Sequence, residues 1–215
     1  MPAANEESWN GLTGAAAGSG PILAAGANGD MFRYSVNVID GVDAYASYSP
    51  SDGTAAIKSS QSFGAQYTGI EGLTVGYANG DNNMQTSVTN GLATTHTAGK
   101  DIENTAMFVK YAFDSFTIGM QDNESDSGTA NADYSYRGYG ISYALTEDMS
   151  VSYGVGTVDF ELANSEDQET SAIGVSYTSG GITVSGSMHD GENLGGSAAT
   201  TADRQSYEVN IAFAF

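Results

Sequence analysis

The amino-acid sequence predicts an all-β protein whose antiparallel strands run up and down in succession. Three observations predict this class. From residue 31 onward apolar and polar residues alternate, which is the period of a strand with two unlike faces. The connections between these segments alternate between short and long along the chain. Abundant Gly (28) and Tyr (13), with only 3 Pro, favour strands and turns over helices.

Eleven segments of similar length show this alternation, and the second follows a tight Asp40-Gly41 turn. The expected strands cover residues 32–39, 42–48, 60–67, 73–79, 106–113, 116–121, 139–145, 149–155, 172–178, 182–188 and 207–215. Apolar sets that justify ten of them, in order, are Tyr34, Val36 and Val38; Phe63, Ala65 and Tyr67; Leu73, Val75 and Tyr77; Met107, Val109, Tyr111 and Phe113; Phe116, Ile118 and Met120; Tyr139, Ile141, Tyr143 and Leu145; Met149, Val151, Tyr153 and Val155; Ile173, Val175 and Tyr177; Ile182, Val184 and Met188; and Tyr207, Val209, Ile211, Phe213 and Phe215. Ser, Thr, Gly, Asn and Gln fill the opposite positions, so the second face of each strand is polar.

The lengths of the connections follow a regular rhythm. Short turns ("IDG", "TGIEG", "FDS", "LTED", "SGG") alternate with long polar stretches at residues 49–56, 80–104, 122–133, 160–170 and 190–203. Short turns at one rim and long loops at the other are typical of an up-and-down transmembrane β-barrel. A Greek-key sandwich has no reason to keep this rhythm.

Aromatic residues crowd the side of the short turns. The members of this series are Tyr67, Tyr111, Phe113, Phe116, Tyr143, Tyr177 and Phe215. A belt of aromatic rings is expected where membrane hydrocarbon meets the headgroups. The sequence holds no run of about 18 apolar residues that could form a transmembrane helix, so the pattern favours strands that cross a membrane as a barrel.

Composition excludes several other classes. With 6 Lys and Arg residues against 26 Asp and Glu residues, the formal charge is -20, and such a chain would repel a nucleic-acid backbone. Because Cys is absent, there is no disulfide, thiol nucleophile or Cys-based metal site. The segment "MPAANEESWNG" is acidic and lacks the apolar core of a signal peptide.

The alternating strands, the rhythm of the loops and the terminal "YEVNIAFAF" carry a family resemblance. The chain resembles the Gram-negative outer-membrane general porins of the sixteen-strand type. In that family the last strand ends in Phe with apolar or aromatic residues at alternate positions, and the outer-membrane assembly machinery recognises this signal. The residues that match it are Tyr207, Val209, Ile211, Phe213 and Phe215.

The resemblance implies that the chain consists of two parts with different roles. Residues 1–30 resemble a remnant of the constriction loop that family porins insert into the lumen, and residues 31–215 would be transmembrane barrel strands. Bacterial barrels close with an even number of strands, so eleven strands of a likely sixteen imply the C-terminal portion of a porin, from the constriction loop onward. The alternative is that "GPILAAGA" adds a strand to make a complete twelve-stranded barrel.

The family pattern also implies where the pore-lining charges lie. Acids on the inserted loop face Arg and Lys on the wall, and the two sets create a field across the constriction. The residues expected in these roles are Glu6, Glu7 and Asp30 on the loop, and Arg33, Lys58 and Lys110 on the wall. Arg137 shares its phase with apolar neighbours, so we expect it to point outward, toward lipopolysaccharide phosphates.

No catalytic or cofactor motif is found. The chain has no G-x-S-x-G, Walker or H-E-x-x-H pattern, so we expect no enzymatic activity. His96 and His189 are expected to be solvated polar residues, not metal ligands. The stretch "DNESDSGTANAD" (122–133) lacks the spacing and closing Glu of an EF-hand loop. We therefore expect no cofactor, with weak Ca²⁺ binding at the acidic loops left open.

Together these features predict an outer-membrane porin of a Gram-negative bacterium. It would be a passive diffusion channel for small hydrophilic solutes and ions, and the -20 charge predicts a preference for cations. Its partners would be the lipid bilayer, lipopolysaccharide and the assembly machinery, and the resemblance implies a homotrimer. The alternatives are a non-channel outer-membrane or surface β-protein of the adhesin type and, third, a soluble all-β enzyme.

Overall fold

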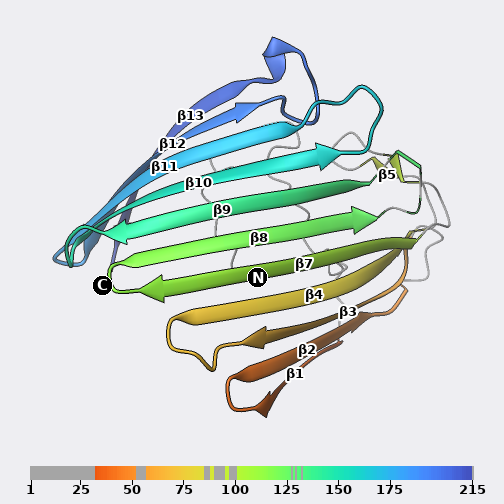
Figure 1. Cartoon of the computed structure of the whole chain (residues 1–215), viewed down its shortest axis with the longest axis horizontal. Coiled ribbons are helices and arrows are strands. Elements are labelled where there is room, and N and C mark those ends of the chain that lie inside the picture. Colours follow the sequence, from red (N-terminus) through yellow and green to blue (C-terminus); the bar gives the residue numbers. More distant parts are fainter. Residues whose placement is uncertain are drawn as a thin grey trace.

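The computed structural model of the protein describes residues 32–51, 57–84, 88–89, 95–96, 101–126, 128, 130–131 and 133–214. Within these residues the fold is one curved sheet of eleven antiparallel strands (Figure 1). Its strands are β1 (Phe32–Ile39), β2 (Val42–Ser49), β3 (Ile57–Tyr67), β4 (Leu73–Met84), β7 (Asp101–Phe113), β8 (Phe116–Asp126), β9 (Tyr134–Ala144), β10 (Met149–Phe160), β11 (Gln168–Ser179), β12 (Ile182–Glu192) and β13 (Arg204–Phe213). Each strand pairs with the next one along the chain, which confirms the predicted all-β, up-and-down fold.

Two small elements lie in the long connections. The strands β5 (Val88–Thr89) and β6 (Thr95–His96) form a separate two-stranded sheet between β4 and β7. A single 3-10 turn, η1 (Thr200–Ala202), precedes β13. No helix in the described part of the chain is long and apolar enough to cross a membrane.

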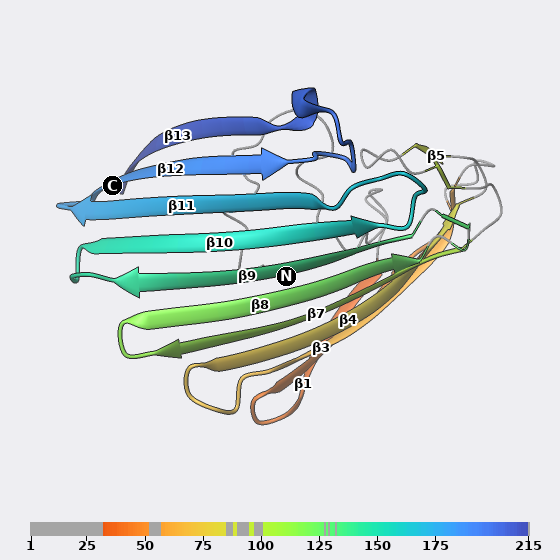
Figure 2. The same cartoon turned by 45° about the horizontal axis from the view of Figure 1, so that its top comes forward.

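The short turns lie at one rim of the sheet and the long connections at the other (Figures 1 and 2). At the short-turn rim, turn carbonyls extend the strand ladder: Gly41 O accepts from Thr68 N at 2.7 Å and Ser115 O accepts from Ala144 N at 2.8 Å. Gly41 has a φ of +76°, and a Cβ there would lie 2.5 Å from the Gly69 Cα. Glycine is therefore required at position 41, where the turn between β1 and β2 meets the turn between β3 and β4.

Several strands are longer than the sequence predicts, always at the long-loop end. β8 continues through Asp122–Asp126 and β10 continues to Phe160, whereas the predicted strands stop at residues 121 and 155. The prediction was wrong there because the outward apolar pattern ends while the backbone ladder continues. On β8 both faces become polar, and on β10 the apolar residues Val158 and Phe160 lie on the inner face instead. Part of the stretch 122–133, which we compared with a calcium loop, is therefore strand.

The two faces of the sheet differ strongly in exposure. On β7, the outward side chains Met107 and Tyr111 are 52% and 39% exposed, whereas the inward Ala106 and Phe108 are 1% and 4% exposed. The outer face carries similar exposed apolar side chains on every strand from β1 to β13. Such a large apolar surface is not compatible with water on that side and is typical of strands that face lipid.

The inner face has two halves. Near the long loops its side chains are buried, and a small core of Tyr136, Val158 and Phe160 packs there with Tyr134. Near the short turns the inner side chains are small, polar and partly exposed. The sheet is open in the described part of the chain, because β1 and β13 each pair on one side only.

The predicted constriction-loop remnant, residues 1–30, lies outside the described residues. The same holds for the segment that would have supplied a twelfth strand.

Candidate functional site

The inner face of the sheet is the candidate functional surface, and the strand register decides which charged residues reach it. Lys110 pairs with Thr74 and Gly119 and lies on the inner face, with its side chain exposed. Arg33 pairs with Ser47 on the same face. The Arg33 guanidinium lies 5.8 Å from the centre of the Tyr45 ring, a cation-π distance that orients the charge along the wall.

The described inner-face bases do not form one cluster, and a third one, Arg204, lies on β13 opposite Gly191. Arg33 lies on β1 and Lys110 on β7, four strand spacings apart in the sheet order, which corresponds to about 19 Å at the usual spacing between strands. Lys58 belongs to β3, but its side chain is outside the described residues. Glu6, Glu7 and Asp30 are outside as well, so the expected pairing of loop acids with wall bases stays a prediction.

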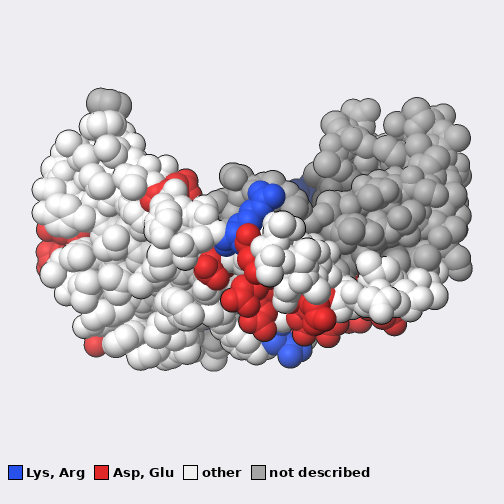
Figure 3. Space-filling view, turned by 90° about the horizontal axis from the view of Figure 1, so that it is seen from above, with Lys and Arg blue, Asp and Glu red and all other residues white. Residues whose placement is uncertain are grey.

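Most acids on the described strands face outward. Inward carboxylates are Asp43 on β2, which accepts a hydrogen bond of 3.2 Å from Asn37 Nδ2, and Glu208 on β13. The outward acids gather at the long-loop end, and we call this set the acidic rim. Its members are Asp81, Glu103, Asp122, Glu124, Asp126, Asp159, Glu169, Asp190 and Glu192. Figure 3 shows acidic side chains gathered in the middle of the molecule and toward this end.

Sequence reasoning missed the acidic rim, although a signal was present. On β8, Asp122, Glu124 and Asp126 continue the phase of Ile118 and Met120, so a period-2 count carried past the apolar set would have placed them outward. Much of the -20 charge is therefore outside the inner wall. Any effect of these acids on ion selectivity would therefore come from the long-loop end of the outer face and not from the inner wall.

Arg137 points outward, as predicted, and it is already paired. Its Nε donates to Asp122 Oδ2 at 2.8 Å, with the two side chains 60% and 24% exposed. The pair joins β8 to β9 on the acidic rim. A contact of Arg137 with lipopolysaccharide phosphates would therefore be made by a guanidinium that keeps one carboxylate partner.

Four of the seven aromatic rings predicted at the short-turn rim form a row. Tyr111 and Phe113 stack with ring centres 5.5 Å apart, Phe113 and Phe116 at 5.6 Å, and Phe116 and Tyr143 at 4.4 Å. The row runs along β7, β8 and β9 and lies on the outer face. It marks the level at which the apolar outer face meets a polar interface. Phe215, predicted at the same level, is outside the described residues.

One inner residue was predicted wrongly. His189 is 1% exposed, not solvated, because it lies within β12 on the inner face, where the long-loop half of the wall is covered. Its Nε2 shares a hydrogen bond of 2.8 Å with Ser187 Oγ. Among the described residues, no group of three or more His, Asp and Glu side chains is placed to hold a metal ion.

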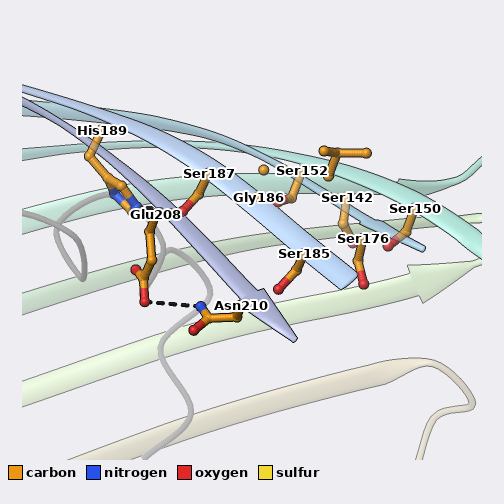
Figure 4. A pocket seen from close by; sticks show the side chains of 12 residues that line it. Ser142, Ser150, Ser152, Ser176, Ser185, Gly186, Ser187, His189, Glu208 and Asn210 are labelled. Atoms are coloured by element: carbon orange, nitrogen blue, oxygen red, sulfur yellow. Dashed lines mark hydrogen bonds between the residues drawn. The ribbon is translucent and has the colours of Figure 1, made fainter. Parts of the chain in front are cut away.

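A hollow of about 580 Å³ lies on the inner wall of the last strands. Figure 4 shows serine side chains from β9 to β12 lining it, with Glu208 and Asn210 of β13 at one side. The serines that line it are Ser142, Ser150, Ser152, Ser176, Ser185 and Ser187. The hollow is therefore polar but carries few charges.

An up-and-down antiparallel sheet with an apolar outer face, an aromatic row at one rim and a polar inner wall defines an outer-membrane β-barrel protein. The family model of Gram-negative porins matches residues 3–193, so the chain belongs to the Gram-negative porin family. That membership places the protein in the outer membrane, with its outer face against lipid. No curated protein sequence matches the chain.

Solved structures of porins share this fold. OmpT of Vibrio cholerae matches with a TM-score of 0.61 and 16% identity, over 85% of this chain and 64% of that one. An anion-selective porin from Comamonas acidovorans matches with a TM-score of 0.64 and 13% identity, over 86% and 59%. The outer-membrane channel DcaP of Acinetobacter baumannii matches with a TM-score of 0.64 and 11% identity, over 86% and 62%. The chain spans about three fifths of the length of these porins.

Proposed function

We propose that the protein is a passive diffusion channel for small hydrophilic solutes and ions in the outer membrane. The observation that carries this proposal is the contrast between the two faces of one sheet. The outer face exposes apolar side chains, whereas the accessible half of the inner face carries Ser, Thr, Gly and Asn. A wall that is polar on the inside alone suits a water-filled lumen.

Conductance of the full-length protein in a planar lipid bilayer tests the channel. We expect stepwise increases in current as single molecules insert. Heat-modifiable migration on a gel, with and without boiling, provides the control that the protein is folded. A folded protein that inserts and yet conducts no ions would contradict the proposal.

A preference for cations is part of the proposal, and the acidic rim supports it. On the described strands the inner wall carries Arg33, Lys110 and Arg204 against Asp43 and Glu208, so it contributes no net negative charge. The acidic rim, with its exposed carboxylates, lies at the long-loop mouth. Acids at a mouth raise the local cation concentration. The reversal potential in a KCl gradient measures the preference, and anion selectivity would rule it out.

The Comamonas relative is described as anion-selective, so the fold alone does not decide the sign of the preference. In our proposal the bases Arg33, Lys58 and Lys110 line one part of the lumen. The acids Glu6, Glu7 and Asp30 oppose them at the constriction. Opposed charges of this kind orient dipolar solutes as they pass.

We also propose three partners. The family resemblance supports a homotrimer, which chemical cross-linking in native outer membranes would detect. Arg137, with its side chain 60% exposed on the acidic rim, supports contact with lipopolysaccharide. The alternating Tyr207, Val209, Ile211 and Phe213 of β13, each more than half exposed on the outer face, support recognition by the assembly machinery.

A further inference from the structure

The hollow on the inner wall of β9 to β13 has the chemistry of a binding site. We propose that it binds uncharged, hydroxyl-rich solutes of the oligosaccharide class as they pass along the wall. This proposal rests on the channel function proposed above and names a class of solute for it. Three observations carry it: the geometry of the serines, the polar groups at one end of the hollow, and the charge of the wall.

The serines come from neighbouring strands in register. Ser142 pairs with Ser152 across β9 and β10, and Ser176 pairs with Ser185 across β11 and β12. Gly174, which faces Ser152, leaves space there, because a Cβ at that position would lie 2.9 Å from Ser152 Oγ. Small side chains on four adjacent strands thus leave a shallow space lined by hydroxyl groups that are only partly covered.

An amide and a carboxylate, from Asn210 and Glu208, lie where β12 pairs with β13. Ser185 pairs with Asn210, and Ser187 pairs with Glu208. Asn210 Nδ2 donates to Glu208 Oε1 at 2.9 Å (Figure 4), so an amide and a carboxylate lie together at this side of the hollow. This end of the hollow offers both donors and acceptors within reach of one solute.

His189 lies at the buried end of the hollow and supports its wall. It lines the hollow, it is 1% exposed, and its Nε2 is held by Ser187 Oγ at 2.8 Å. Its Nδ1 is buried and has no hydrogen-bond partner within the described part of the chain. Because this nitrogen is inaccessible from the hollow, the contribution of His189 is to hold Ser187, which lines the hollow.

The charge of the wall selects the class of solute. On the described inner face of β8 to β12 no Lys, Arg, Asp or Glu is present, and Glu208 is the single carboxylate that lines the hollow. Arg204 is on the inner face of β13 but is not among the described residues that line the hollow. A phosphate or carboxylate solute would therefore find no cation among the described lining residues, and one carboxylate is too few ligands for a divalent cation. Serine hydroxyls both donate and accept, as sugar hydroxyls do. None of the described residues that line the hollow is aromatic, so we expect weak binding, of the order of millimolar.

Block of the ion current by a neutral sugar tests the site. The full-length protein is reconstituted in a planar bilayer in KCl, and maltotriose is titrated against the current. We expect a saturable decrease, stronger than that caused by maltotrionate, the corresponding sugar acid. The variant Ser187→Ala with Asn210→Ala should raise the half-blocking concentration by about fivefold or more, since one lost hydrogen bond is worth about that factor.

The matched control is Thr74→Ala on β4, which removes an inner-wall hydroxyl outside the hollow and should leave the block unchanged. If the double variant fails to fold, Ser142→Ala with Ser176→Ala tests the same wall. A channel that conducts but shows equal block in wild type and variants, or stronger block by maltotrionate, would overturn the solute site and leave the channel function intact. A folded protein without conductance would overturn both.

Discussion

At the scale of single residues, neighbours on one strand have opposite environments. Phe108 faces inward and is 4% exposed, whereas Met107 faces outward and is 52% exposed. The sequence pattern predicted this alternation from the apolar phase of Met107, Val109 and Tyr111. It did not predict that the inner Phe108 would be buried, because the polar phase of a barrel strand is expected to face water.

The first prediction compares these two neighbours. Phe108→Ala should lower the free energy of unfolding by about 3 to 5 kcal/mol, because the substitution leaves a cavity in a covered part of the inner wall. Met107→Ala should cost clearly less, since lipid can fill the space at an outward position. Urea unfolding of the protein in lipid vesicles measures both. Equal losses for the two variants would show that Phe108 is not packed as described.

The second prediction concerns two bases with different positions. Lys110→Glu changes a charge on the inner wall, and Arg137→Glu makes the same change on the acidic rim. We expect Lys110→Glu to increase cation preference in both dilute and 1 M KCl, because a charge inside the lumen lies close to every passing ion. Arg137→Glu should act only in dilute KCl, because the Debye length falls to about 3 Å at 1 M. Reversal potentials at both KCl concentrations measure the ion preference of each variant. If the two variants behave identically, the placement of Lys110 on the inner face and Arg137 on the outer face would be contradicted.

At the scale of elements, the strands are where sequence reasoning was strongest. All eleven strands of the main sheet were predicted, because each has an apolar face that must meet lipid. Their long-loop ends were missed: residues 101–105 of β7 and 134–138 of β9 lie beyond the apolar band. In that region the outer face is polar and apolar residues such as Ile102 and Tyr136 lie on the inner face, so the outward apolar pattern ends although the strand pairing continues.

The third prediction tests where the apolar band ends on β8. Met120→Arg places a charge among outward apolar side chains and should cost about 2 to 4 kcal/mol if it lies near the bilayer midplane. Glu124→Arg, four residues along the same face, lies on the acidic rim and should cost little. Folding into vesicles under a urea series measures both. A similar cost for the two variants would mean that the band continues to Glu124.

At the scale of the whole molecule, charge and chemistry are distributed unevenly. The acidic rim lies outside and at the long-loop end, and the wall from β8 to β12 is neutral in the described strands. The inner-face bases are Arg33 on β1, Lys110 on β7 and Arg204 on β13. The net charge of -20 predicts a preference for cations, which stays a prediction, and it gives no position for the source of that preference. Only the strand register assigns each acid to a face, and composition contains no such information.

The last prediction follows from that distribution. If cation preference originates at the acidic rim, then neutralising Glu103, Glu124 and Asp126 together, as Glu103→Gln, Glu124→Gln and Asp126→Asn, should reduce it in 10 mM KCl. At that ionic strength the Debye length is about 30 Å, so the rim acts on the whole mouth. In 1 M KCl the same variant should match the wild type. Asp43→Asn, a single change on the inner wall, is the comparison, and its smaller effect should persist at high salt. A triple variant with unchanged reversal potential in dilute KCl would exclude the rim as the source and leave the inner wall to account for any preference.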